Sequence, residues 1–426
     1  MNINPGDYVK ITTKDSTFEG MIIERPKTLD DEIITIKLES GYNIGINKKN
    51  ILSIEKISEK RTQVKSESNL IKIPEKRITL IAVGGTISSK IDYETGGVSA
   101  KYDVQNFLKK FPELNDYNIY PIGFMNKMSE DFLPEDWMAI AREVYNNLID
   151  NNVEGVIITH GTDTMSYTAS ILSFFLQNLN KPVILTGAQR SLDRPSTDAK
   201  INLICSAIAA KSSIAEIGIV MHGSSNDDYC LWHFGTRVRK MHTSRRDAFR
   251  SINSLPIAKI YPDGKIDLMS NNVNLRNDKI PILDLSFEEK VGFIYVHPNM
   301  DPEIVDFFID RGYKGLVIQG TGLGHVPTNC RKEIVSKIEK AIQSGIVVVI
   351  TSQTLYGRVH PAVYSNLRKL LSLGCIFAQD MIPEVAYVKL CWALGKTKNP
   401  EEVRKLMLSP ISHEINPSSN FLSFLN

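Results

Sequence analysis

Short segments in which apolar and polar residues alternate fill the first 57 residues of the chain. Alternation of this kind, with β-branched residues inside the segments and turn-forming residues between them, is typical of half-buried β-strands. Strands are predicted at residues 8–12, 17–23, 33–38, 42–46 and 51–54. Five short strands at this spacing predict a small β-barrel over residues 1–57.

The pattern changes twice further along the chain. Residues 58–76 are polar and of mixed charge, which is the composition of a linker. Beyond them, apolar runs alternate with helical stretches. The runs lie at residues 78–83, 155–159, 182–186 and 217–221. Because these runs are apolar at consecutive positions, they predict a parallel sheet covered by helices on both faces, in an α/β domain over residues 77–285.

A second series of apolar runs follows a less regular stretch at residues 250–290. The runs lie at residues 292–297, 315–319 and 346–351, and a helix is predicted at residues 331–344. They predict a smaller α/β lobe over residues 286–426. The fold class expected is therefore α/β, with two lobes built on parallel sheets behind a small N-terminal barrel.

Composition narrows the class of protein. The 426 residues are 42% hydrophobic and 23% charged, as in ordinary globular proteins, and 50 basic and 48 acidic residues leave a net charge of +2. So balanced a charge produces no overall field that would gather nucleic acid. The first residues lack the pattern of a secretory signal, and the apolar runs are far shorter than the ~20 residues of a membrane helix, so we expect a cytoplasmic protein.

The five cysteines are an odd number and form no CxxC pair. This spacing argues against a disulfide framework or a zinc site. We expect buried thiols in a reducing compartment.

Three turns that follow predicted strands are unusually polar. In open α/β sheets the ligand lies beyond the carboxyl ends of the strands, so these turns are the candidate site. The first turn lacks the glycine spacing of a nucleotide loop and the Gly-Lys-Ser/Thr ending of a P-loop. The turns are Gly84-Gly85-Thr86-Ile87, His160-Gly161-Thr162-Asp163-Thr164 and Gly187-Ala188-Gln189-Arg190-Ser191.

Two threonines, Thr86 and Thr162, are placed to face this crevice. A threonine hydroxyl becomes a nucleophile only beside a base or cation, and a lysine whose pKa burial lowers could serve, with Asp163 to orient it. Each residue also has a structural interpretation. The threonines could be turn or cap residues, Asp163 a helix cap and His160 a packed side chain. The basic stretch at residues 237–250 would ordinarily be a solvated face.

The three turns resemble motifs of the bacterial-type L-asparaginase family, whose first motif reads Gly-Gly-Thr-Ile and whose second reads His-Gly-Thr-Asp-Thr. Both stand intact in this chain, in the same order, and the resemblance covers residues 77 to the end. It implies an amidohydrolase in which Thr86 is the primary nucleophile and Tyr93 assists it. It further implies that Thr162, Asp163 and Lys240 transfer protons. The positions implied to bind substrate are Ser129, Glu130, Gly85 and Gly161.

Position 130 departs from the usual asparaginase, which more often has Gln there. Glu130, the N-terminal domain and the segments Pro134 to Trp137 and Gln189 to Asp198 together look like the D subunits of archaeal glutamyl-tRNA(Gln) amidotransferases, with an SH3-like barrel at the N-terminus. That resemblance implies a glutaminase that passes ammonia to a kinase-like partner, the E subunit of the amidotransferase, which activates Glu-tRNA(Gln). It implies a homodimer within a heterotetramer, no membrane contact, no metal or cofactor in this chain, and ATP and magnesium in the partner.

Two other functions remain open from the sequence. A free-standing L-asparaginase would be fully active without any partner. A catalytically inactive binding module would lack reactive residues, yet all five implied catalytic positions carry them. The three functions differ in ammonia release. An amidotransferase subunit would depend on a partner and charged tRNA, a free-standing asparaginase would not, and a binding module would release none.

Overall fold

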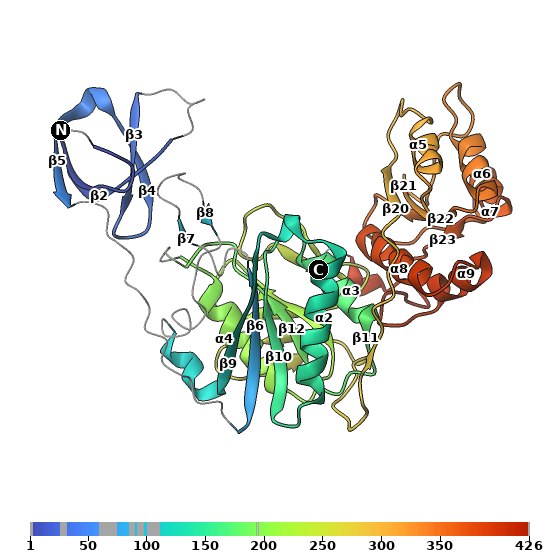
Figure 1. The fold of residues 1–426 in the computed structure, drawn as a ribbon, viewed down its shortest axis with the longest axis horizontal. Helices are drawn as coiled ribbons and strands as arrows, with labels where there is room; N and C mark the ends of the chain where they lie inside the picture. The colour runs from blue at the N-terminus through green and yellow to red at the C-terminus, as the bar shows by residue number, and fades with distance from the viewer. Residues whose placement is uncertain are drawn as a thin grey trace.

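The computed structural model describes residues 3–25, 32–58, 75–84, 90–91, 98–99, 111–192, 194 and 196–424; residues 90–91 and 98–99 are described by their backbone alone. An N-terminal sheet, a central domain and a C-terminal lobe follow one another along the chain (Figure 1). The predicted linker lies mostly outside the described residues. A hydrogen bond from the Tyr42 hydroxyl to Ser196 Oγ (3.3 Å) links the N-terminal sheet to the central domain.

The N-terminal sheet is antiparallel, with the strand order β4-β3-β2-β1-β5. Alternate residues such as Val9, Ile11 and Ile36 are fully buried on one face, as the sequence pattern predicts. No ladder joins β4 to β5 in the described part of this domain, so the closed SH3-like barrel is not confirmed. The strands are β1 (Tyr8–Thr13), β2 (Thr17–Ile23), β3 (Ile33–Leu38), β4 (Asn43–Asn47) and β5 (Ile51–Ser58), with the 3₁₀ turn η1 (Lys48–Asn50) before β5.

The central sheet has the order β18-β17-β14-β13-β12-β10-β6-β9. The strands from β9 to β13 are parallel, as predicted for the four apolar runs, but β14, β17 and β18 are antiparallel, so the sheet as a whole is mixed. Short connections, such as residues 223–229, can join only antiparallel neighbours. The strands are β6 (Arg77–Gly84), β9 (Ile119–Lys127), β10 (Val153–Thr159), β12 (Val183–Thr186), β13 (Ile217–His222), β14 (Cys230–Phe234), β17 (Ala258–Ile260) and β18 (Ile266–Leu268).

Helices cover both faces of the central sheet (Figure 1). Side chains of β6 alternate between the faces: Ile81 and Val83 belong to the core that contains α2 and α3, whereas Leu80 and Ala82 belong to the core that contains α4. The helices are α2 (Pro134–Ile149), α3 (Met165–Phe175) and α4 (Ala199–Lys211); smaller elements are β7 (Lys90–Ile91), β8 (Val98–Ser99), η3 (Pro112–Tyr117), η4 (Ser129–Asp131), β11 (Leu176–Gln177), β15 (Val238–Lys240), β16 (Phe249–Ser251) and β19 (Ile282–Leu283).

The C-terminal lobe has a four-stranded parallel sheet with the order β20-β21-β22-β23. Helices α5, α6 and α7 pack on one face, and α8 and α9 on the other (Figure 1). The predicted helix at residues 331–344 is shorter, because α6 begins at Val335. The elements are β20 (Val291–Tyr295), β21 (Gly315–Gly320), β22 (Val347–Ser352), β23 (Ile376–Phe377), α5 (Ile304–Asp310), α6 (Val335–Gln343), α7 (Ser365–Ser372), α8 (Pro383–Lys396), α9 (Pro400–Leu408) and, near the C-terminus, η5 (Phe421–Ser423).

The central domain and the C-terminal lobe share one hydrophobic core, where α3 packs against α8. The rings of Phe174 and Trp392 stack at 5.8 Å between centroids. Arg237 is fully buried between the two parts. Its Nε donates to His413 O (2.6 Å) and its Nη1 to Asp380 O (3.0 Å). The two parts are thus fixed against each other close to Lys240.

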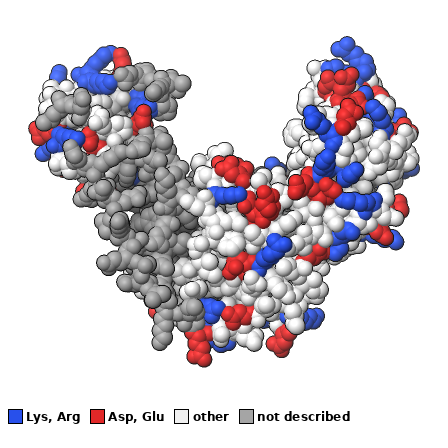
Figure 2. Space-filling view, viewed as in Figure 1, with Lys and Arg blue, Asp and Glu red and all other residues white. Residues whose placement is uncertain are grey.

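The basic stretch at residues 237–250 is therefore not simply a solvated face. Besides the buried Arg237, Arg239 pairs with Glu384 (2.9 Å) and Arg246 with Asp227 (2.7 Å). The expectation for the cysteines holds for four of them and is wrong for Cys330, which is exposed. Lys, Arg, Asp and Glu are interspersed over the described residues on the face drawn in Figure 2. None of the helices in the described ranges combines the length and the apolar surface that crossing a membrane requires.

Candidate active site

The three polar turns lie at one edge of the central sheet because their strands are in register. Thr159, at the end of β10, pairs with Thr186, at the end of β12. On the other side, Ile158 pairs with Ile81 of β6. All three strands are parallel, so the residues that follow them come together at the carboxyl edge.

The first turn opens at Gly84, whose φ is +123°. A Cβ at this position would lie 2.1 Å from Lys127 O, so only glycine lets β6 end so close to β9. Gly85, Thr86 and Tyr93 lie outside the described residues. Their roles as nucleophile, assisting tyrosine and substrate-binding glycine stay predictions.

The second turn brings together the three residues expected to transfer protons. Lys240 Nζ donates to Thr162 Oγ1 (2.9 Å) and to Asp163 Oδ1 (2.7 Å). Thr162 is buried and the Lys240 side chain is 13% exposed, while the Asp163 side chain is 67% exposed. The amine thus bridges a buried hydroxyl and a solvent-facing carboxylate, a geometry through which a proton can pass from the hydroxyl toward solvent.

Lys240 reaches Thr162 from a separate part of the chain. It ends β15, which pairs with β16 so that Lys240 lies opposite Phe249. Phe249 is fully buried and anchors this hairpin in the core. Asp163 does not cap α3, whose N-cap residue is Thr164, so its interpretation as a helix cap is wrong.

Ser129 lies directly beside the second turn. A Cβ at Gly161 would lie 2.7 Å from Ser129 Oγ, so the two segments touch only because position 161 is glycine. Thr164 Oγ1 donates to Ser129 O (2.7 Å) and holds this contact. Ser129 is buried and Glu130 next to it is exposed. The structure therefore brings Ser129, Gly161 and Thr162 together.

His160 is a packed side chain. His160 Nδ1 faces the carbonyl oxygen of Gly161 (2.7 Å), so Nδ1 carries the proton and donates. In a neutral ring Nε2 is then an acceptor, and the Thr168 hydroxyl, which also accepts from Trp137 Nε1 (3.0 Å), donates to it (2.8 Å). Burial lowers the pKa of His160 to about 4, although the bond to Gly161 O opposes the shift. A neutral His160 fixes Gly161.

The third turn lies close to Thr162. A Cβ at Gly187 would lie 3.2 Å from Thr162 Cγ2 and 2.6 Å from His160 O. The buried carboxylate of Asp198 holds the turn by accepting from the backbone N–H groups of Gln189 (3.0 Å) and Arg190 (3.0 Å). The sequence analysis placed Asp198 in a segment shared with the family but missed this role. The available signal was that Asp198 follows the turn by only a few residues.

A cavity of about 410 Å³ lies beside Lys240 and opens to solvent. Burial, with a smaller contribution from Glu384, raises the pKa of Tyr167 in its wall to about 12, so the phenol stays neutral. The residues lining it include both charged pairs, Lys240 with Asp163 and Arg239 with Glu384. Within the described ranges, His, Cys, Asp and Glu side chains form no group of three that could hold a metal ion.

Three family models match consecutive parts of the chain. The "GatD N-terminal domain" matches residues 3–57, "Asparaginase, N-terminal" residues 77–274 and "Glutaminase/Asparaginase C-terminal domain" residues 290–407. The matched segments contain every residue of the candidate site.

Curated relatives match over the full length. A protein of Pyrococcus abyssi, named as the D subunit of glutamyl-tRNA(Gln) amidotransferase, is 48% identical over 100% of this chain and 98% of its own length. A protein of the same name from Methanobrevibacter smithii is 45% identical over 100% and 97%. Among solved structures, the thermostable L-asparaginase from Thermococcus kodakarensis has a TM-score of 0.73 and 31% identity, over 80% of this chain and 100% of that one. L-asparaginase I from Vibrio cholerae has a TM-score of 0.68 and 28% identity, over 80% and 99%.

Proposed function

Since this chain belongs to the family of glutamyl-tRNA(Gln) amidotransferase D subunits and is an amidohydrolase component, we propose that it hydrolyses glutamine at the carboxyl edge of its central sheet. The ammonia released converts Glu-tRNA(Gln) to Gln-tRNA(Gln) on a partner protein. The single observation that carries the assignment of the site is the amine of Lys240, bonded to both Thr162 and Asp163.

In the proposed reaction, Thr86 Oγ attacks the carbon of the side-chain amide, assisted by Tyr93. The tetrahedral intermediate collapses as the C–N bond breaks, and the nitrogen takes a proton and leaves as ammonia. Water then attacks the acyl-threonine ester, which releases glutamate and restores the Thr86 hydroxyl. Backbone donors of the turns, among them Gly85, stabilise the oxyanion of both steps.

Thr162, Lys240 and Asp163 move the protons that these steps require. Thr162 lies behind the nucleophile in the proposed arrangement, and Lys240 carries its proton toward the exposed carboxylate of Asp163. Ser129 and Glu130 hold the α-amino and α-carboxylate groups of the substrate, with Gly161 as their backbone neighbour. The contact of Gly161 with Ser129 supports placing both at one site.

The partner supplies the remaining chemistry in this proposal. The kinase-like E subunit activates the tRNA-bound glutamate with ATP and magnesium, while this chain uses no metal or organic cofactor. Two copies of each protein form a heterotetramer in the cytoplasm, and this chain meets tRNA mainly through the partner. We propose that residues 1–57, as an SH3-like barrel, serve this assembly. Deleting residues 1–60 should then impair tRNA-dependent conversion more than glutamine hydrolysis by this chain alone, and equal impairment would contradict this role.

A free-standing L-asparaginase is not favoured, because the full-length relatives carry the name of an amidotransferase component and the two solved asparaginases match 80% of this chain. An inactive binding module is not favoured either, because the relatives are enzymes by name and the proton-transfer group is intact.

Ammonia release tests the proposal. The purified chain is given glutamine, or asparagine as a comparison, with and without the partner protein and charged Glu-tRNA. We expect glutamine hydrolysis that the partner and Glu-tRNA stimulate. Full activity toward asparagine that neither addition changes would contradict the amidotransferase role.

A further inference from the structure

A series of hydrogen bonds between polar side chains, called the His222 chain below, starts at the third turn and runs away from the candidate site. Asn202 Nδ2 donates to Gly187 O (3.0 Å) and to Asp198 Oδ2 (3.1 Å). Gly187 lies close to Thr162, since a Cβ at this glycine would be 3.2 Å from Thr162 Cγ2. Asp198 and Asn202 are both fully buried, so the position of the turn depends on them and not on solvent.

These two bonds fix the orientation of the Asn202 amide. Turning the amide over would place its oxygen against Gly187 O and the Asp198 carboxylate, which are both acceptors. Asn202 Oδ1 therefore faces the other way, toward His222 Nδ1 at 2.6 Å. His222 must donate through Nδ1.

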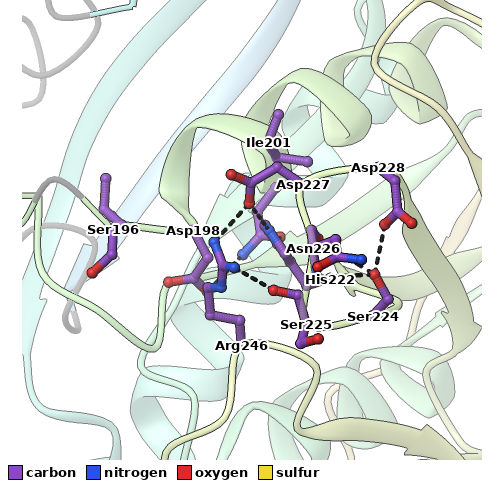
Figure 3. Close-up of polar contacts among 12 residues, drawn as sticks. Ser196, Asp198, Ile201, His222, Ser224, Ser225, Asn226, Asp227, Asp228 and Arg246 are labelled. Carbon is purple, nitrogen blue, oxygen red and sulfur yellow. Dashed lines mark hydrogen bonds and ion pairs between the residues drawn. The ribbon is translucent and has the colours of Figure 1, made fainter.

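The other ring nitrogen of His222 also faces an acceptor. Nε2 lies 3.0 Å from Asp227 Oδ1, and Arg246 Nη1 donates to the same oxygen (2.7 Å) (Figure 3). A carboxylate bound by a guanidinium is ionised, so it accepts from Nε2 as well. Both ring nitrogens thus face acceptors, an arrangement that a doubly protonated ring satisfies, even though the ring is fully buried.

Charge balance agrees with this assignment. The ionisable groups that face the ring or its partners include the carboxylates of Asp198 and Asp227 and the guanidinium of Arg246. Two thiols complete the set: Cys230, which donates to Asn202 Oδ1 (3.5 Å), and Cys205, which is hydrogen-bonded to Cys230. Burial raises the pKa of Cys230 well above its usual value, so this thiol is neutral. The two negative carboxylates are then matched by two positive groups, Arg246 and His222, only if His222 is charged.

The far end of the His222 chain, at Arg246, returns to the proton-transfer group. Arg246 lies in the segment that joins β15 to β16. Lys240, which is bonded to Thr162, is the last residue of β15 in the same hairpin. Arg246 Nη2 also bonds to the backbone oxygen of Ser225. Thr162 is therefore held between the Gly187 turn on one side and the Lys240 hairpin on the other, and His222 connects the two supports.

We propose that His222 is a positioning residue: as a buried imidazolium it holds Asn202, and through it the Gly187 turn, against Thr162. The inference rests on the proposed function of Thr162 and Lys240 in proton transfer. His222 itself touches no reacting atom. Its effect is to keep the Thr162 hydroxyl at hydrogen-bonding distance from Lys240.

The test combines ring-nitrogen NMR with kinetics on the full chain. In protein labelled with ¹⁵N-histidine, both His222 ring nitrogens should be protonated at neutral pH. Asp227→Asn replaces the carboxylate with an amide whose nitrogen can donate to Nε2, so one proton should leave the ring, and Arg246 loses the acceptor that it shares with the ring. The control is Asp228→Asn. The Asp228 carboxylate accepts from Ser224 Oγ (2.6 Å) and is not part of the His222 chain (Figure 3). The control substitution should leave both ring protons and the activity unchanged.

In glutamine hydrolysis, His222→Gln and Asp227→Asn should lower kcat about 10- to 100-fold with little change in KM, as expected for a misplaced catalytic group. Because Asp227 is largely exposed, its substitution tests the inference even if His222→Gln does not fold. A wild-type ring with one protonated nitrogen would overturn the charge assignment, and loss of a ring proton in Asp227→Asn with unchanged kcat would overturn the positioning role. Since the NMR result is independent of turnover, failure of the Thr162 and Lys240 assignment, seen as an active Lys240→Met variant, is recognised separately.

Discussion

Replacing Lys240 by methionine removes the amine that joins Thr162 to Asp163 and keeps most of the side-chain volume. The stability cost should be small. Asp163 is 67% exposed, so its ion pair contributes no more than about 1 kcal/mol, and the hydrogen bond to Thr162 adds a similar amount. The catalytic cost should be larger, because loss of a proton-transfer residue slows a reaction by about 10²–10⁴, which corresponds to about 3–5 kcal/mol of transition-state stabilisation.

The assay compares two quantities in one preparation: the rate of ammonia release from glutamine and the free energy of unfolding in urea. Arg245→Met is the matched control, because Arg245 is a cation of the same segment that pairs with Asp247 (2.8 Å) and touches neither Thr162 nor Asp163. It should retain activity within a few-fold of wild type. A Lys240→Met variant with nearly full activity, or one whose activity falls only as far as its folded fraction, would refute the reasoning.

Three further outcomes are expected. Thr86→Ala should abolish ammonia release with an unchanged circular dichroism spectrum, and activity within a few-fold of wild type would contradict its role as nucleophile. Gly161→Ala places a methyl group 2.7 Å from Ser129 Oγ and should raise KM for glutamine at least several-fold, whereas Gly123→Ala, whose added Cβ meets nothing within 4 Å, should not; equal KM values would count against the placement of Ser129. The pKa of His160, about 4, lies below its ordinary 6.5, so the unfolded chain takes up this proton first and stability falls by about 3 kcal/mol as pH drops from 6.5 toward 4; urea titrations of wild type and His160→Gln at both pH values should show a shallower loss in the variant.

The strands that form the candidate site could be predicted from the sequence. The predicted run at residues 155–159 ends where β10 ends, and the run at 182–186 ends where β12 ends. Buried parallel strands leave long apolar runs, and the polar turn after each marks the carboxyl edge. The antiparallel strands β17 and β18 were missed because each has three residues and carries a polar one, Lys259 or Asp267. The omission of β14, whose five residues are mostly buried, has no such explanation in the sequence pattern.

From the residues alone, without the family resemblance, the site was predictable only where a motif stands in one segment. Thr162 and Asp163 are adjacent, but Lys240 approaches them from 78 positions beyond Thr162, and spacing alone gives no sign of that contact. The burial of Arg237 was missed for the same reason, since its partner His413 lies 176 residues away. The His222 chain likewise depends on pairings between separate elements that only the fold creates.

Transfer of the amide nitrogen of glutamine tests the central assignment most directly. Glutamine labelled with ¹⁵N at the side-chain amide is given to this chain with its partner protein, ATP, magnesium and Glu-tRNA(Gln), and the label is measured in the tRNA-bound amino acid. We expect the label in Gln-tRNA(Gln) with the wild-type chain, its loss with Thr86→Ala or Lys240→Met, and recovery of unlabelled product in both variants when ammonium is supplied. Product that carries no label with the wild-type chain, or full labelling with either variant, would contradict a glutaminase that works through these residues.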